Sequence, residues 1–214
     1  MGEQAGELSL ADWRRRIAEL YADVRRIAAI DPRAAHAVWR GVRETLYQNH
    51  AQSPVPAEER PAFEALLFEY DPAVRFVAAV EPEPPAAVDG DAQPLDLPNS
   101  GADLLSFRRV GSVQLPFPEG SRRLSVFWME GYAGGLFLPF RDATNGVETY
   151  GAGRYLLDGA KGADLGGDVA RATLILDFNF AYQPSCAFDP RWACPLAPPE
   201  NRLDIQVRAG ERIA

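Results

Sequence analysis

The sequence predicts an α+β protein, mainly β, in which a two-helix N-terminal arm precedes an antiparallel β sandwich or barrel. Apolar residues recur at three- and four-residue steps only in the first 52 residues, which is typical of amphipathic helices. After about residue 61, short runs rich in Val, Phe, Leu and Tyr are separated by Gly, Pro and Asn, which is typical of strands joined by turns. Helical and strand patterns do not alternate, so a parallel α/β sheet is disfavoured.

Two amphipathic helices are expected in the arm. The first should begin at Ser9 as the capping residue, with Asp12 three residues later. The second should begin after Asp31-Pro32, because Asp caps well and Pro suits the first helical position, and it should end before Ser53-Pro54. Their apolar stripes must be buried against the body or against a second copy of the chain, so a homodimer through the arm is one alternative. The two stripes comprise Trp13, Ile17, Leu20, Tyr21, Val24 and Ile27, and Val38, Trp39, Val42, Leu46 and Tyr47.

The remainder, residues 53–214, should form the β body, and with the arm at 1–52 it should make one structural unit. A chain of 214 residues is long enough for one well-filled core. Turn signals lie at Gly111, at Glu119-Gly120 and at Gly134-Gly135. Strands are expected near residues 74–80, 104–110, 112–117, 122–130, 135–140, 153–157, 172–180 and 203–208.

The net charge is −8, and much of the acidic excess lies in a proline-rich stretch at residues 81–98 that contains no Lys or Arg. We expect this stretch to be a loop within the β body. An acidic chain without a basic stripe repels phosphate backbones, so nucleic acid is not expected as a partner.

The beginning of the chain carries acids where a secretory signal needs a basic start, and no apolar run approaches the ~18 residues of a membrane span. A cytoplasmic protein without a membrane partner is therefore expected. In a reducing compartment Cys186 and Cys194 should be thiols. The alternative, a disulfide between them, would stabilise the fold by roughly 2–3 kcal/mol.

Polar residues in three apolar segments are the best candidates for a site. Period-two alternation along 173–180 places Asp177 and Asn179 on one face, about 7 Å apart along the strand. Tyr150 and Arg154 share a face of the next segment, and a guanidinium suits a carboxylate of the protein or of a ligand. Asn201 falls on the apolar face of the last strand, where a buried amide should hold a neighbouring loop in place.

The motifs FRDATNG (140–146), TYGAGRYL (149–156), DFNFAYQPSCA (177–187) and CPLAPPENRL (194–203), with the closing Ala209-Gly210-Glu211, resemble the domain-of-unknown-function family 1684. The resemblance runs from roughly the first helix to the C-terminus. Where many members have Asn before the Pro, and often a second Pro, this chain has Gln183 and Ser185. The family is bacterial and archaeal with no assigned activity, so the resemblance implies a β-rich fold and transfers no catalytic residue.

Nucleophilic, metal and cofactor sites are not supported by the sequence. His36 and His50 lie on or beside the second helix, far along the chain from Cys186 and Cys194, so a Cys–His dyad would need the arm to fold over the body. The close-spaced ligand pairs of a zinc site are missing. The glycines around 151–153 are only a fragment of a phosphate-binding motif. We expect neither a metal nor a cofactor.

Carboxylate chemistry remains open. If two of Asp142, Asp177 and Glu200 met across a cleft, they could act as general acid and base in a hydrolase or lyase. The competing interpretation is structural: Asp142 caps the turn at 144–146, and Asp177 pairs with Arg154 to close a corner of the sheet.

The leading hypothesis is a small-molecule-binding β domain with a polar pocket for a small polar or anionic metabolite. The residues expected to line this pocket are Tyr150, Arg154, Asp177, Asn179 and Tyr182. Two alternatives remain: the acid/base enzyme described above, and a structural or assembly protein whose arm pairs two chains.

Overall fold

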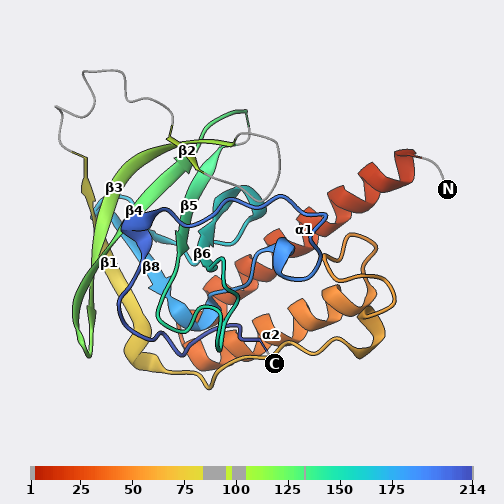
Figure 1. Ribbon diagram of the computed structural model, residues 1–214, viewed down its shortest axis with the longest axis horizontal. Coiled ribbons are helices and arrows are strands. Elements are labelled where there is room, and N and C mark those ends of the chain that lie inside the picture. The colour runs from red at the N-terminus through yellow and green to blue at the C-terminus, as the bar shows by residue number, and fades with distance from the viewer. Residues whose placement is uncertain (1–2, 84–94, 98–104, 133, 214) are drawn as a thin grey trace.

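The computed structural model describes residues 3–83, 95–97, 105–132 and 134–213. The arm consists of helices α1 (Glu3–Ala28) and α2 (Pro32–Asn49), which lie side by side along one side of the molecule (Figure 1). Asp31 caps α2 as predicted, accepting a hydrogen bond of 3.0 Å from the amide of Ala34. The predicted cap at Ser9 is wrong, because good helix formers precede it and α1 already begins at Glu3.

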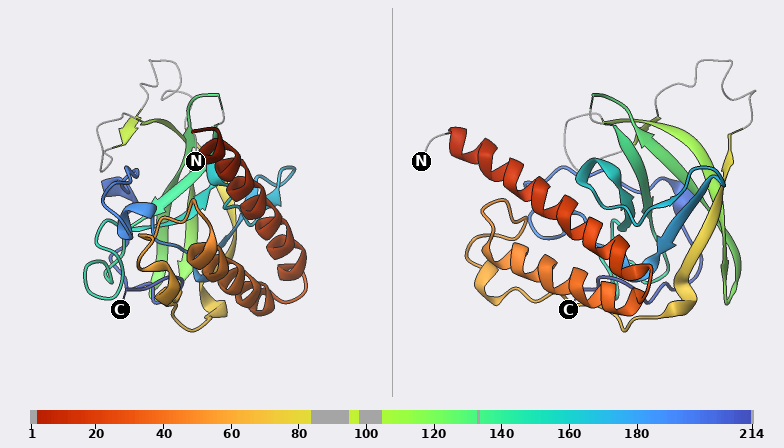
Figure 2. Two further views of the ribbon diagram at one scale, coloured as in Figure 1. Left: turned by 90° about the vertical axis from the view of Figure 1, so that its right-hand side faces the viewer. Right: turned by 180° about the vertical axis from the view of Figure 1, so that it is seen from behind.

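The body is one antiparallel sheet that curls into a half-barrel, and Figure 2 shows the two helices lying across one side of it. Its strand order is β6-β5-β4-β3-β1-β8-β7, and β2 pairs with β3 outside this path. The helical arm and the mainly antiparallel β body are therefore as predicted. The strands are β1 (Arg75–Pro82), β2 (Leu95–Leu97), β3 (Leu105–Phe117), β4 (Gly120–Met129), β5 (Gly135–Phe140), β6 (Arg154–Asp158), β7 (Gly167–Asp168) and β8 (Thr173–Asp177).

Gly111 marks a bulge within β3 rather than the predicted turn between two strands. The register of β3 against β4 shifts between Arg109 and Gly111, and the strand then continues. On its other side, the backbone of Gly111 lies so close to the Glu81 carbonyl oxygen of β1 that a Cβ atom would overlap it. Glycine thus permits the close approach of two strands. Most of the predicted loop at 81–98 lies outside the described residues, although its ends belong to β1 and β2.

The predicted strand at 203–208 is not a strand of the sheet, and only the isolated bridge between Arg141 and Arg202 lies at its start. Its side chains alternate as expected, with Leu203, Ile205 and Val207 buried. Its backbone makes only scattered hydrogen bonds, such as Leu203 N–H to the Arg141 carbonyl at 2.8 Å. The Val207 carbonyl instead accepts from a side chain, that of Arg154. The alternation of apolar and polar residues therefore predicted which side chains are buried, but it did not predict whether the segment pairs with another strand.

Two apolar clusters form the core. The first lies within the curl of the sheet. The second joins the arm to the body, because the buried stripe residues Tyr21 and Trp39 pack with Phe137, Tyr155 and Tyr182. The arm's apolar faces are thus buried in large part against the same chain. No helix among the described residues is long and apolar enough to cross a membrane.

Candidate functional site

Arg154 is fully buried, and the protein itself accepts the hydrogen bonds of both its Nη groups, whereas Nε has no hydrogen-bond partner among the described residues. Its guanidinium donates to Asp142 Oδ2 at 2.7 Å, to the Val207 carbonyl at 2.8 Å and to the Glu211 carbonyl at 3.1 Å. It also donates to the carbonyl of Ala209. Arg154 therefore fastens the C-terminal segment to β6, and its exposed fraction of 0% leaves no face for a ligand.

Asp142 has the structural role that the sequence suggested. Its Oδ1 accepts hydrogen bonds from the Thr144 amide at 2.6 Å and from the Thr144 hydroxyl. Asp142 thereby caps the turn after β5. Its Oδ2 pairs with Arg154. The predicted pair between Asp177 and Arg154 is therefore wrong, because Asp142 takes the place of Asp177.

Asp177 and Asn179 lie together at the end of β8, but not as strand neighbours. The strand ends at Asp177 and the 3-10 helix η5 (Phe178–Phe180) follows, so Asn179 Nδ2 donates to Asp177 Oδ1 at 2.7 Å. Asp177 Oδ2 accepts from the Tyr70 hydroxyl at 3.2 Å and lies 3.5 Å from Arg75 Nε. Burial raises the pKa of Asp177. These contacts tie the linker before β1 to the end of β8.

Glu200 is exposed in the 3-10 helix η7 (Pro199–Asn201). The next residue, Asn201, is fully buried and bonds with both the N–H and the carbonyl of Ser125, at 2.7 and 2.9 Å, and with the Pro139 carbonyl at 2.8 Å. It anchors η7 to β4 and β5, as a buried amide was expected to anchor a loop. The three catalytic candidates thus have different surroundings, two as structural carboxylates and one on the surface.

A cavity of about 340 Å³ lies between the arm and the body, and we call it the arm–body cavity. Of the predicted pocket residues, Tyr182 lines it. Its walls come from both helices, from the 3-10 helix η4 (Gly159–Lys161) and from the segment after β8. The lining residues are Leu10, Trp13, Arg14, Ile17, Tyr21, Arg43, Tyr47, Gln52, Pro54, Ala160, Lys161, Ala163, Tyr182, Gln183, Ser185, Trp192, Ala193 and Cys194.

Arg43 of α2 is the buried cation of this cavity. Glu211 binds it through Nε and, at 3.1 Å, through Nη2. The rings of Tyr47 and Tyr182 lie 4.3 and 4.8 Å from the guanidinium carbon, which gives cation–π contacts on top of the ion pair. Glu211 also accepts from the Gln183 amide at 2.7 Å. The C-terminal Glu211 thus links the arm to the body at the cavity.

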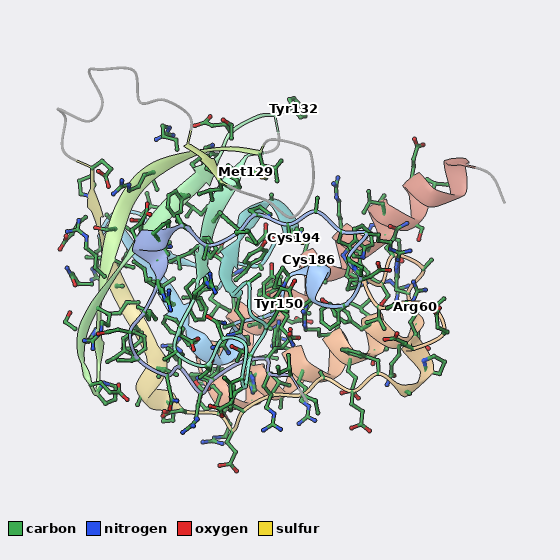
Figure 3. All side chains as sticks on the ribbon, in the orientation of Figure 1. Arg60, Met129, Tyr132, Tyr150, Cys186 and Cys194 are labelled. Atoms are coloured by element: carbon green, nitrogen blue, oxygen red, sulfur yellow. The ribbon has the colours of Figure 1, made fainter. Side chains whose placement is uncertain are left out.

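Two cysteines lie at the cavity, which Cys194 lines, and Figure 3 shows Cys186, Cys194 and Tyr150 close together. Both cysteines are buried thiols, and Cys194 Sγ accepts from the Cys186 amide at 3.3 Å. The Tyr150 hydroxyl donates to the Cys186 carbonyl at 3.3 Å. Hydrogen bonding to Cys186, followed by burial, raises the pKa of Cys194. Cys194 is therefore a neutral thiol and a poor nucleophile.

The charged side chains that line the cavity are all basic: Arg14, Arg43 and Lys161. Lys161 Nζ lies 3.6 Å from Asp158 Oδ2, which also accepts from the Tyr182 hydroxyl at 3.1 Å. Burial raises the pKa of Tyr21 to about 12, so this phenol stays neutral at the cavity. Within the part of the chain that the structure describes, no group of three or more His, Cys, Asp or Glu residues is placed to hold a metal ion.

Sequence reasoning missed Arg43, although a signal for it exists. Arg43 lies four residues after Trp39 and four before Tyr47, so it falls on the apolar face of α2. A lone charge on a buried stripe requires a partner from elsewhere in the fold. The partner, Glu211, lies in the closing Ala209-Gly210-Glu211 motif, but nothing in the sequence pairs these two residues.

Comparison with known proteins gives a family and a fold without a function. The family model described as "Protein of unknown function (DUF1684)" matches residues 62–212. A solution NMR structure of an uncharacterized protein from Haloarcula marismortui is similar, with 32% sequence identity and a TM-score of 0.58. The match covers 81% of this chain and 90% of that one. No curated protein matches the chain.

Proposed function

The chain belongs to the DUF1684 family of proteins of unknown function, and from this premise we propose that it binds a small molecule in the arm–body cavity. The observation that carries the proposal is the cavity itself, of about 340 Å³. Ligand sites typically measure ~300–1,000 Å³ and combine an apolar lining with a few fixed polar groups.

The lining of the cavity fits this description. Trp13, Ile17 and Trp192 contribute apolar surface, and Arg43 and Tyr182 contribute polar groups that are held in place by Glu211 and Asp158. Groups fixed in advance lose little conformational freedom when a ligand binds. The cavity is therefore prepared for a ligand rather than assembled around one.

This proposal moves the predicted binding site. Arg154, Asp177 and Asn179 bond to other parts of the protein, so we assign them to the support of the fold. Tyr182 remains a ligand-binding residue. Tyr150 does not line the cavity, and its hydroxyl donates to the carbonyl of Cys186 next to it. The alternative, a hydrolase or lyase with two carboxyl groups as acid and base, is disfavoured. Asp142 and Asp177 are buried in separate hydrogen-bond networks.

A cavity-filling substitution tests the proposal. Ala193 lines the cavity with an exposed side chain, so Ala193→Phe should occupy the space without removing a stabilising contact. We expect a metabolite library to contain compounds that raise the Tm of the wild-type protein and bind in calorimetry, and the variant should lose both effects. A matched control is Ala79→Phe, at an exposed position of β1 outside the cavity. A library without any stabilising compound, or hits that bind Ala193→Phe as well as wild type, would overturn the proposal.

A further inference from the structure

The charges around the cavity indicate the class of its ligand. This inference rests on the proposed function. We propose that the arm–body cavity takes an organic monocarboxylate with an aromatic or branched apolar body. The carboxylate is bound between Arg14 of α1 and Lys161 of η4, which both line the cavity. The apolar body lies against the aromatic and aliphatic part of the lining.

The first support is the sign of the charge. Among the charged side chains that line the cavity, Arg14, Arg43 and Lys161 are basic, and there is no carboxylate to balance them within that lining. Glu211 already neutralises Arg43 from behind with two hydrogen bonds, and Asp158, outside the lining, lies 3.6 Å from Lys161. The described contacts of Arg14 include no ion pair. An anion is the ligand charge that complements this surface.

The second support is the position of two of these cations. A Cβ atom added at Gly162 would lie 3.6 Å from Ile17 Cγ2, so Ile17 packs beside the residue that follows Lys161. Arg14 lies three residues before Ile17 and therefore one turn away on the same face of α1. Arg14 and Lys161 thus flank the same contact between α1 and η4.

The third support concerns the aromatic rings, which in other settings would favour a cationic ligand. Here the guanidinium of Arg43 already occupies the faces of Tyr47 and Tyr182, and it lies 5.5 Å from the ring of Trp39. A ligand ammonium entering the cavity would meet a like charge beside these rings. Cationic ligands are therefore disfavoured.

Three probes with the same body but different charge test the inference: 3-phenylpropanoate, 3-phenylpropanamide and 3-phenylpropylamine. We expect calorimetry on the full chain to give an affinity about tenfold higher for the acid than for the amide, because a charge-assisted hydrogen bond is worth about that much. The amine should bind more weakly than the amide. Added salt should reduce the ratio of the affinity for the acid to that for the amide, because salt screens exposed charges.

Substitution of the two cations locates the carboxylate. Arg14→Gln combined with Lys161→Gln should reduce the preference for the acid to within about twofold, while binding of the amide is kept. Arg26→Gln, at an exposed position of α1 paired with Asp23, is the matched control and should leave the preference unchanged. Equal affinity for acid and amide, or a preference that survives the double substitution, would overturn the inference.

The outcomes also separate this inference from the proposed function. If acid and amide bind equally and Ala193→Phe abolishes both, the cavity is a binding site but the preference for an anion is wrong. If none of the three probes binds at millimolar concentration, the monocarboxylate inference is overturned. The wider metabolite library then decides whether the cavity binds small molecules at all.

Discussion

A buried guanidinium is expensive to desolvate, so Arg154 is stable in the interior only because the fold surrounds it with acceptors. The four acceptors come from the turn after β5 and from three carbonyls of the C-terminal segment. The carbonyls of Val207 and Ala209 belong to residues outside the strands of the sheet, and Glu211 makes only an isolated bridge with Leu67. Arg154 therefore supplies donors that a neighbouring strand would otherwise have supplied.

Arg154→Met should destabilise the protein by about 3–5 kcal/mol, because it leaves the buried Asp142 carboxylate without its cation and three carbonyls without their Arg154 donor. Urea denaturation monitored by fluorescence measures the loss of unfolding free energy. Arg108→Ala is the control, since Arg108 pairs with Glu130 on the surface, and its effect should be close to zero. Similar effects of the two substitutions would contradict the assigned role of Arg154.

His36 makes the stability depend on pH. Its ring is buried against Trp39, Tyr70 and Phe180, at centroid distances of 5.7, 5.5 and 5.3 Å. Burial lowers the pKa of His36 to about 4, with smaller contributions from Arg40 and Arg33, while its bond to the Asn179 backbone opposes this. The unfolded chain binds this proton near pH 6.5, where the folded protein does not. The stability that His36 contributes is therefore complete above pH 6.5 and falls as the pH drops towards 4.

The loss from His36 should reach at most about 3 kcal/mol at the acid end of this range. The neighbouring Asp177 acts in the opposite direction, because burial raises its pKa and the folded state takes up that proton more readily as the pH falls. Urea denaturation of wild type and His36→Phe across this pH range isolates the His36 contribution. The unfolding free energy of wild type minus that of His36→Phe should be constant above neutrality and should decrease in acid. A difference that does not vary with pH would contradict the prediction.

Features of the site that depend on neighbouring residues in the sequence could be predicted, whereas those that depend on contacts between distant segments could not. Period-two alternation grouped Asp177 with Asn179 and Tyr150 with Arg154, and the structure buries both Arg154 and Asp177. It could not decide whether Asp142 or Asp177 pairs with Arg154, because that choice depends on how β5, β6 and β8 are arranged in space. The arm–body cavity was out of reach for the same reason, since its walls come from segments far apart in the sequence.

At the scale of elements, glycines with different surroundings give a matched pair of predictions. Gly111→Ala should cost about 1–3 kcal/mol, because its Cβ would overlap the Glu81 carbonyl and push β3 away from β1. Gly41 lies within α2, and a methyl group added there would meet nothing within 4 Å, so Gly41→Ala should stabilise the protein by about 0.5–1 kcal/mol. Thermal and urea denaturation of both variants measure the two effects. Destabilisation by Gly41→Ala, or tolerance of Gly111→Ala, would contradict the surroundings assigned to these two glycines.

The same contrast explains which elements the sequence predicted. Strands β1, β4 and β5 were found close to their bounds, since each combines β-branched or aromatic residues with clear turn signals. Gly111 was read as a turn because a bulge and a turn both favour glycine. The segment at 203–208 has the burial pattern of a strand, but its Val207 carbonyl bonds to Arg154 instead of a neighbouring strand. Local patterns specify which side chains are buried, whereas pairing is decided by distant partners.

At the scale of the whole molecule, the arm and the body share one core and one cavity. The second apolar cluster contains residues from both parts, including Trp39 and Tyr47 from the arm and Phe137 and Tyr155 from the body. The ion pair of Arg43 with Glu211 joins α2 to the C-terminal segment within that cluster. If each part were separated from the other, it would expose apolar surface and one member of a buried pair. These contacts predict that the arm cannot unfold alone.

We therefore expect the two parts to unfold in a single transition. Far-UV circular dichroism at the helix band reports mainly the arm, where α1 and α2 lie, and the reaction of Cys186 and Cys194 with a thiol reagent reports the body, where both are buried. The two signals should have the same urea midpoint, as two-state behaviour requires. Trp39→Ala, in the arm, should lower the stability measured by both signals by the same amount, about 3–5 kcal/mol. A helix signal that is lost first, while the thiols stay protected, would show instead that residues 1–52 form a separate folding unit, and the arm–body cavity would then depend on a docking equilibrium.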